Sequence, residues 1–321
     1  MYQIAKNFLS MKNTIILLFI FPILILAQTK PIEESTKKSG SYDSNKFSQM
    51  YDILATPNMF RTASGAPGPA YYQQQADYKI DIELDDKNSK LSGSETITYY
   101  NNSPDTLEYL WVQLDQNQAA KKAQSPLPED QRTEEVFTPN NFANKFLKQG
   151  LERGFTIEYI KDSKGNALPY TINQTMMRID LPTPMESGEK ISFSIKWWYN
   201  INNYRQDGGR SGYELFEKDG NKLYIIAQFY PRMAVYNDVE GWQNMQFWGS
   251  GEFTLPFGNF DVNITVPADH VLNATGELMN RNEVFTAAQV KRYELAQKTF
   301  DKPIVIVTQA EAEIAEKGFS D

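Results

Sequence analysis

A strict alternation of apolar and polar side chains begins at residue 77 and constrains this chain more than any other feature. In residues 77–85, DYKIDIELD, the side chains of Tyr78, Ile80, Ile82 and Leu84 fall on one face. Successive side chains of a β-strand point to opposite faces, so this pattern predicts a strand with one buried face. Such a face needs a second layer to cover it.

The same pattern returns along most of the chain. Short turn-rich segments separate the further predicted strands, which we place within residues 91–102, 107–117, 154–162, 167–173, 176–182, 190–201, 222–231 and 251–267. The short connections between the first three strands predict an antiparallel meander. With 18 Tyr, 19 Phe and 5 Trp to fill a core, the sequence predicts a mainly β fold: a large antiparallel β-sandwich or saddle-like domain.

Helical patterns are confined to short segments. We expect short helices within residues 44–54, 140–148 and 286–300, and the start of another within 309–319. Residues 116–150 are polar and contain three Pro, which indicates an insertion laid over a sheet edge. Residues 303–308, PIVIVT, are expected to form a short buried strand.

The amino-terminal segment is typical of a secretion signal. Residues 15–27 form an unbroken apolar run, preceded by Lys6 and Lys12 and by no acidic residue. A spanning helix needs about 20 apolar residues, so the run is short for an anchor. We expect cleavage after Ala27, delivery to the periplasm or the medium, and no stable membrane anchor thereafter. An uncleaved anchor is the alternative.

Composition excludes several kinds of site. The chain has one His, His270, and no Cys. A catalytic zinc normally needs three protein ligands drawn mostly from His and Cys, so this chain alone cannot build one. A Cys nucleophile, a disulfide and an iron–sulfur cluster are excluded in the same way. The net charge of −8 repels phosphate backbones, so we expect no nucleic-acid partner.

The remaining polar motifs favour surface positions. His270 adjoins Asp269, but neighbours on a turn are expected to point apart, so we interpret His270 as a solvent-facing turn residue. The acidic pairs at 85–86 and 134–135 lie in a polar turn and in the insertion, where carboxylates are ordinary solvated groups. These residues give no sign of a catalytic triad or a glycosidase pair.

Aromatic residues in the loop from residue 238 to residue 251 are harder to assign. Trp242, Phe247 and Trp248 lie there. Their side chains could cover a neighbouring domain or stack on a sugar. The sequence leaves both interpretations open.

Residues 211–278 carry a more specific pattern. A strand with Gln228 is followed by a turn with Arg232, a loop from Tyr236 to Trp242, and a closing element from Val262 to Pro267. This order resembles the N-terminal β domain of the zinc aminopeptidases of peptidase family M1, in a secreted branch with an insertion after the third strand. Residues 67–114 are similar to the opening strands of that domain, and the resemblance covers roughly residues 60 to 310.

The resemblance implies a division of labour between two domains. The family's zinc motif, H-E-x-x-H, and its substrate motif, G-x-M-E-N, are absent from this sequence. Zinc is therefore expected only in the complete family enzyme, and this chain is expected to be inactive by itself. The resemblance implies one substrate-binding residue here, Gln228, which would help to hold the free amino group of a peptide. The alternative is a Gln228 side chain bonded to its own sheet or to the insertion.

These inferences give a predicted organisation. Residues 1–27 are the signal, and 28–76 a polar leader with a short helix and a Gly/Pro loop. Residues 77–300 form the β domain, and 301–321 a truncated connection towards a missing catalytic domain. The partners are then that domain and a peptide N-terminus. A free-standing extracellular β-sandwich module that binds carbohydrate or peptide is the alternative. Substrate preference and oligomeric state do not follow from the sequence.

Overall fold

The structure is a computed structural model, and it describes residues 57–120, 138–139, 153–207, 211–218, 220–248 and 254–318. The predicted mainly β class is confirmed, because several antiparallel sheets and a few short helices make up this part of the chain. The predicted helices within 44–54 and 140–148 lie outside the described residues. Among those described, no helix has the length and apolar character that a bilayer crossing requires.

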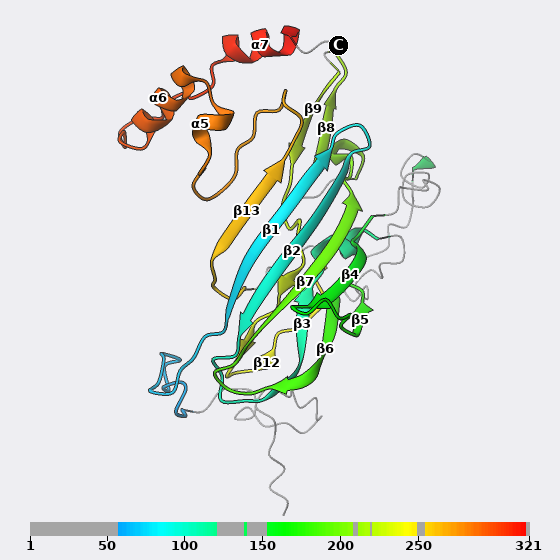
Figure 1. The fold of residues 1–321 in the computed structure, drawn as a ribbon, viewed down its shortest axis with the longest axis vertical. Coiled ribbons are helices and arrows are strands. Elements are labelled where there is room, and N and C mark those ends of the chain that lie inside the picture. The colour runs from blue at the N-terminus through cyan, green and yellow to red at the C-terminus, as the bar shows by residue number, and fades with distance from the viewer. Residues whose placement is uncertain are drawn as a thin grey trace, which may run out of the picture.

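The larger sheet has five strands in the order β13-β1-β2-β7-β4 (Figure 1). Its strands are β1 (Gln75–Asp85), β2 (Lys90–Tyr100), β4 (Thr156–Asp162), β7 (Lys190–Asn200) and β13 (Phe260–Thr265). All neighbours are antiparallel except β1 and β13, which run parallel. The predicted antiparallel character therefore holds for this sheet except at its β13 edge.

The second sheet lies behind the first in Figure 1 and has the order β10-β3-β6-β5. Its strands are β3 (Leu107–Gln113), β5 (Tyr170–Asn173), β6 (Met176–Met185) and β10 (Arg232–Met233). The predicted meander of the first three strands is wrong, because β3 leaves the first sheet and pairs with β6 and β10. The connection after Tyr100 carries the chain from one layer to the other.

Two short hairpins and several helices complete the described chain. The hairpins pair β8 (Gly212–Phe216) with β9 (Asn221–Ile225), and β11 (Tyr236–Asn237) with β12 (Gly241–Trp242). The helices are η1 (Asp115–Ala119), α4 (Tyr204–Asp207), α5 (Arg281–Val284), α6 (Ala287–Ala296) and α7 (Gln309–Gly318). Helix α6 confirms the helical pattern within 286–300, and α7 the pattern that begins at 309.

The segment 303–308 does not form the expected strand. It is irregular, pairs with no described strand, and leaves Val305 62% exposed. Helices α6 and α7 flank it and are joined by an ion pair between Arg292 and Glu311. A short apolar run becomes a strand only where a partner edge is available, and none of the described strands offers one here.

The core lies between the two sheets, where their inward faces meet. One face of β1 supplies Tyr78, Ile80 and Ile82, as the alternation predicted, and Leu110 and Ile179 come from the opposite sheet. Every one of these side chains is at most 6% exposed. The two layers therefore form one sandwich with a shared core.

Trp197 of β7 is the largest fully buried side chain of this core. Its ring lies against Gly93 on β2, where a Cβ atom would approach the ring Cζ2 to 2.6 Å. Phe155 packs against the other part of the ring in an edge-on arrangement, with centroids 6.4 Å apart. A glycine at position 93 thus makes the space that the indole fills.

An ionisable side chain, that of Glu95, lies among these apolar side chains. Glu95 on β2 lies between Ile80 and Ile195 on the adjacent strands and is 2% exposed. Neither carboxyl oxygen has a hydrogen-bond partner among the described residues. Burial raises the pKa of Glu95 well above its ordinary value of 4.5, because the charged form is poorly solvated in the core.

Replacing Glu95 by Gln should change how stability depends on pH. A raised folded-state pKa means that the folded chain keeps a proton which the unfolded chain releases above pH 4.5. Stability therefore falls as pH rises from there towards the raised pKa, by up to about 1.4 kcal/mol per pH unit. Glu95→Gln removes this loss, so its advantage over the native chain should grow with pH.

Urea unfolding at pH 5, 6 and 7 measures this difference. The matched control is Glu83→Gln, because Glu83 is exposed on the neighbouring strand β1. The control should follow the native pH profile. Parallel profiles for the native chain and Glu95→Gln would show that Glu95 is ionised and solvated in the folded state.

Candidate functional site

Gln228 lies outside any strand, contrary to the expectation. Strand β9 ends at Ile225, and the backbone at Gln228 turns into the left-handed region with φ of 53°. The predicted alternation, with Ile226, Gln228 and Tyr230 on one face, is therefore wrong. A left-handed residue cannot continue a strand, and one that is not Gly has a conformational cost of about 1–2 kcal/mol.

Side chains from other parts of the chain hold this turn in place. The Gln116 side-chain amide donates to the carbonyl oxygens of Ala227 and Gln228, at 3.0 and 3.1 Å. The Ser211 hydroxyl accepts from the Ala227 N–H at 2.9 Å and donates to its carbonyl oxygen at 3.0 Å. These bonds replace the ladder that a strand would have provided.

A buried core side chain bonds the backbone of Phe229, the residue after Gln228. The indole Nε1 of Trp197 donates to the carbonyl oxygen of Phe229 at 3.1 Å. Phe229 in turn packs against Tyr230, with ring centroids 5.0 Å apart. The backbone on both sides of Gln228 is thus bonded to residues that are distant in sequence, and its strained conformation is fixed by its surroundings.

The side chain of Gln228 takes no part in these hydrogen bonds. It is half-buried and makes no hydrogen bond within the part of the chain that the structure describes. The alternative in which Gln228 bonds its own sheet therefore finds no support among the described residues, and most of the insertion, the other partner in that alternative, lies outside them. An amide offers one acceptor oxygen and two donor hydrogens, so this group can bind a ligand from either side.

An ion pair lies next to this turn. Arg232 on β10 donates through Nε to Oδ2 of Asp115 at 2.9 Å, and the Asp115 side chain is 0% exposed. Burial raises the pKa of Asp115, while the positive charge of Arg232 opposes the rise. The second carboxylate oxygen, Oδ1, has no partner among the described residues. The pair joins η1 to β10 of the second sheet, close in sequence to Gln116 and to Gln228.

His270 differs from its predicted setting. Its Nδ1 lies 2.8 Å from Oδ1 of Asp269, so the two side chains do not point apart. The imidazole is only 22% exposed and lies 6.2 Å from the ring of Tyr224. The Tyr224 hydroxyl donates to Asp86 instead, at 2.6 Å. The described residues therefore place no hydroxyl nucleophile on this imidazole, and the expected absence of a triad at His270 stands as a prediction.

The aromatic residues of the 238–251 loop divide into two groups. Trp242 stacks on Tyr99 at 6.0 Å and meets Tyr236 edge-on at 5.2 Å, and Phe247 is 4% exposed. These two side chains cover the protein's own core. Trp248 is 39% exposed and is the member of the set that remains available to a partner.

The described residues contain no group of three or more His, Cys, Asp or Glu side chains that could hold a metal ion. The zinc that the sequence resemblance implies therefore does not fit this part of the chain. No chemical step at a metal can be assigned to these residues.

Two anchors of the Gln228 turn could not be identified from the sequence. Gln116 was expected in the insertion, and in the structure it lies in η1 and reaches the turn across 112 residues of chain. Ser211 lies in a polar stretch of sequence that shows neither a strand nor a helix periodicity. Only Trp197, as a large aromatic residue in an alternating strand, carried a signal of burial.

Comparisons with known proteins give a partial likeness in structure alone. No family model matches the sequence, and no curated protein does. An M1 zinc metallopeptidase mutant from Deinococcus radiodurans, bound to a Tyr-Ser-Ala substrate, superposes with a TM-score of 0.33 and 14% identity, over 64% of this chain and 35% of that chain. A two-domain M1 zinc metallopeptidase mutant bound to L-tryptophan gives 0.31 and 13%, over 67% and 39%. The chain thus spans little more than a third of their lengths.

Proposed function

We propose that this chain is the substrate-side β domain of an exported zinc aminopeptidase. In this proposal it forms one wall of the cleft, and Gln228 binds the α-ammonium group at the peptide N-terminus. The sequence pattern from residue 211 to residue 278 supports the family, and the geometry of Gln228 supports the role. The observation that carries the proposal is a strained, tightly held backbone that presents a side-chain amide with no hydrogen bond to the described residues.

The geometry suits recognition of a charged amino group. The Gln228 amide oxygen can accept a hydrogen bond from an ammonium group, and a hydrogen bond to a charged partner contributes about 1.5–3 kcal/mol. Because Gln116 and Ser211 fix the backbone in advance, the backbone of this turn loses little conformational freedom when the ligand binds. The chain itself positions the peptide and supplies no catalytic group.

Gln228→Ala should lower kcat/KM for aminoacyl substrates about 10- to 100-fold when the chain is joined to a zinc-bearing M1 catalytic domain, since each 1.4 kcal/mol is a factor of ten. Competitive inhibition by a tripeptide with a free amino terminus should weaken by a similar factor. Inhibition by the same tripeptide with an acetylated amino terminus should change far less, because it lacks the ammonium group.

Two further variants show whether the loss is specific to the Gln228 amide. Gln243→Ala is the matched control, because Gln243 is also half-buried and forms no side-chain hydrogen bond to the described residues. Gln116→Ala should give a smaller loss in the same direction, since it loosens the turn and leaves the amide in place. Equal losses for free and acetylated peptides, or unfolding of Gln228→Ala in circular dichroism, would falsify the proposed role.

A further inference from the structure

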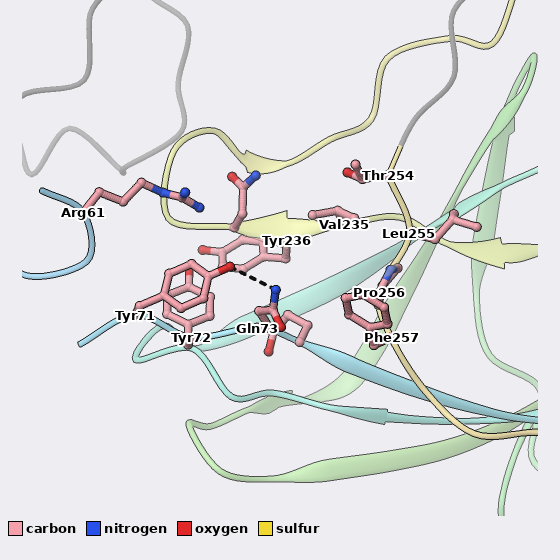
Figure 2. A pocket seen from close by; sticks show the side chains of 12 residues that line it. Arg61, Tyr71, Tyr72, Gln73, Val235, Tyr236, Thr254, Leu255, Pro256 and Phe257 are labelled. Carbon is pink, nitrogen blue, oxygen red and sulfur yellow. Dashed lines mark hydrogen bonds between the residues drawn. The ribbon is translucent and has the colours of Figure 1, made fainter. Parts of the chain in front are cut away.

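A separate pocket lies where the chain enters β1 (Figure 2). Its volume is about 400 Å³, which lies within the range of small-molecule sites, about 300–1,000 Å³. Three segments distant in sequence form its walls: the loop before β1, the stretch around β11, and the residues that precede β13. Gln228 and the residues that hold its turn do not line this pocket.

The walls of the pocket are fixed by contacts between these segments. Arg61 forms a two-pronged ion pair with Asp238, at 2.7 and 2.9 Å, which ties the first loop to the loop after β11. The third segment is bonded to β1 through the Ala76 N–H and the Phe257 carbonyl oxygen, at 3.0 Å. A Cβ atom at Gly258 would meet the Ala76 carbonyl oxygen at 1.6 Å, so only glycine allows this close approach.

The pocket presents no unpaired charge. Arg61 is the one charged residue among those that line it, and Asp238 neutralises its guanidinium group. Tyr236 donates its hydroxyl proton to Asp105 at 2.7 Å. Burial raises the pKa of Tyr72, so its phenol group stays neutral. An anionic ligand would therefore find the cation of the lining already paired, and the Asp105 carboxylate beside Tyr236 is not among the lining residues.

The lining of the pocket combines neutral hydrogen-bonding side chains with aromatic rings. The Gln73 amide nitrogen donates to the Tyr71 hydroxyl at 3.0 Å, and the Arg61 guanidinium lies 5.1 Å from the Tyr71 ring centroid. The Tyr71 hydroxyl keeps its proton as a donor, and the Gln73 amide oxygen accepts no hydrogen bond from the described residues. Figure 2 shows the Tyr71 and Tyr72 rings together on one side of Gln73 and Phe257 on the other. Phe257 is 76% exposed, which leaves its ring open to a ligand.

We propose that this pocket binds a neutral carbohydrate. A pyranose ring has apolar C–H faces that pack on aromatic rings, and hydroxyl groups around its edge that both donate and accept hydrogen bonds. Tyr71 and Gln73 offer one donor and one acceptor at the height of the rings, and Phe257 offers a platform. An apolar peptide side chain would leave these polar groups desolvated and unpaired, which disfavours it.

The test measures binding of neutral tetrasaccharides of glucose, mannose and N-acetylglucosamine to the purified chain by calorimetry and saturation-transfer NMR. At least one should bind in the millimolar range or tighter. Its affinity should change less than about twofold with salt, because no free charge takes part. Phe257→Ala should weaken binding about tenfold, and Phe257→Tyr should retain it.

Phe257→Ala is suitable because a side chain that is 76% exposed contributes little to the folded state. The control is Phe216→Ala on β8, whose ring is 42% exposed and lies outside the pocket. It should bind as the native chain does. Failure of every tetrasaccharide to bind at millimolar concentration, or binding that Phe257→Ala leaves unchanged, would overturn the proposal. Preferential binding of an acetylated, amidated aromatic tetrapeptide would overturn it as well.

Discussion

Trp197→Ala should lower the free energy of unfolding by about 3–5 kcal/mol, the range for truncating a fully buried large aromatic side chain. Trp197 is 0% exposed, and its indole fills the space above Gly93. Neither Gly93 nor Phe155 can move to fill the cavity without distorting its own strand or loop. The variant also loses the hydrogen bond to Phe229, so it should loosen the Gln228 turn at the same time.

Trp198 provides a matched control one residue away. It points to the opposite face of β7, is half-buried, and carries the Lys90 ammonium 4.0 Å above its ring. Loss of an exposed cation–π contact costs about 0.5–1 kcal/mol, so Trp198→Ala should be the milder change. Urea unfolding at one pH compares the two. Equal losses would mean that the faces of β7 are assigned wrongly.

Arg232→Met should also be severe, at about 3–5 kcal/mol near neutral pH, because it leaves the Asp115 carboxylate buried and unpaired. The pKa of Asp115 is already raised by burial, and loss of the arginine removes the charge that opposes the rise. The folded chain would then hold a proton at Asp115 that the unfolded chain releases. The penalty should therefore be largest at neutral pH and shrink as pH falls towards the carboxylate's ordinary range.

The double variant Asp115→Asn, Arg232→Met isolates this cause. With no carboxylate left to desolvate, it should recover much of the stability that Arg232→Met loses. Unfolding free energies of the native chain, both single variants and the double variant form the cycle. A double variant that is less stable than Arg232→Met would contradict the assignment of the penalty to a buried charge.

The sequence alone predicted those strands whose burial comes from alternation. Strands β1, β2 and β7 follow their patterns, because one face of each meets the second sheet. It did not predict the layer to which β3 belongs, since strand periodicity gives a face and not a neighbour. The parallel pairing of β13 was missed for the same reason, because its partner β1 lies far back in the chain.

The conformation of the candidate site could not be predicted from the sequence. Gln228 came from a resemblance of sequence, and its apolar neighbours suggested a strand. The left-handed turn depends on hydrogen bonds from Gln116 and Ser211, and no local pattern reveals contacts of that range. No local pattern indicated that Phe257 would be exposed or that Gly258 would lie against β1.

The parallel pairing of β1 with β13 sets the order in which the fold can close during synthesis. Tyr78 pairs with Phe260, so β1 must wait for almost the whole β domain to emerge before its outer edge is covered. Contacts of such high contact order form slowly, and an open strand edge invites pairing with another chain. A nascent chain that lacks β13 therefore exposes the backbone of β1 to edge-to-edge aggregation. Pairing of β13 with β1 removes this open edge from the larger sheet.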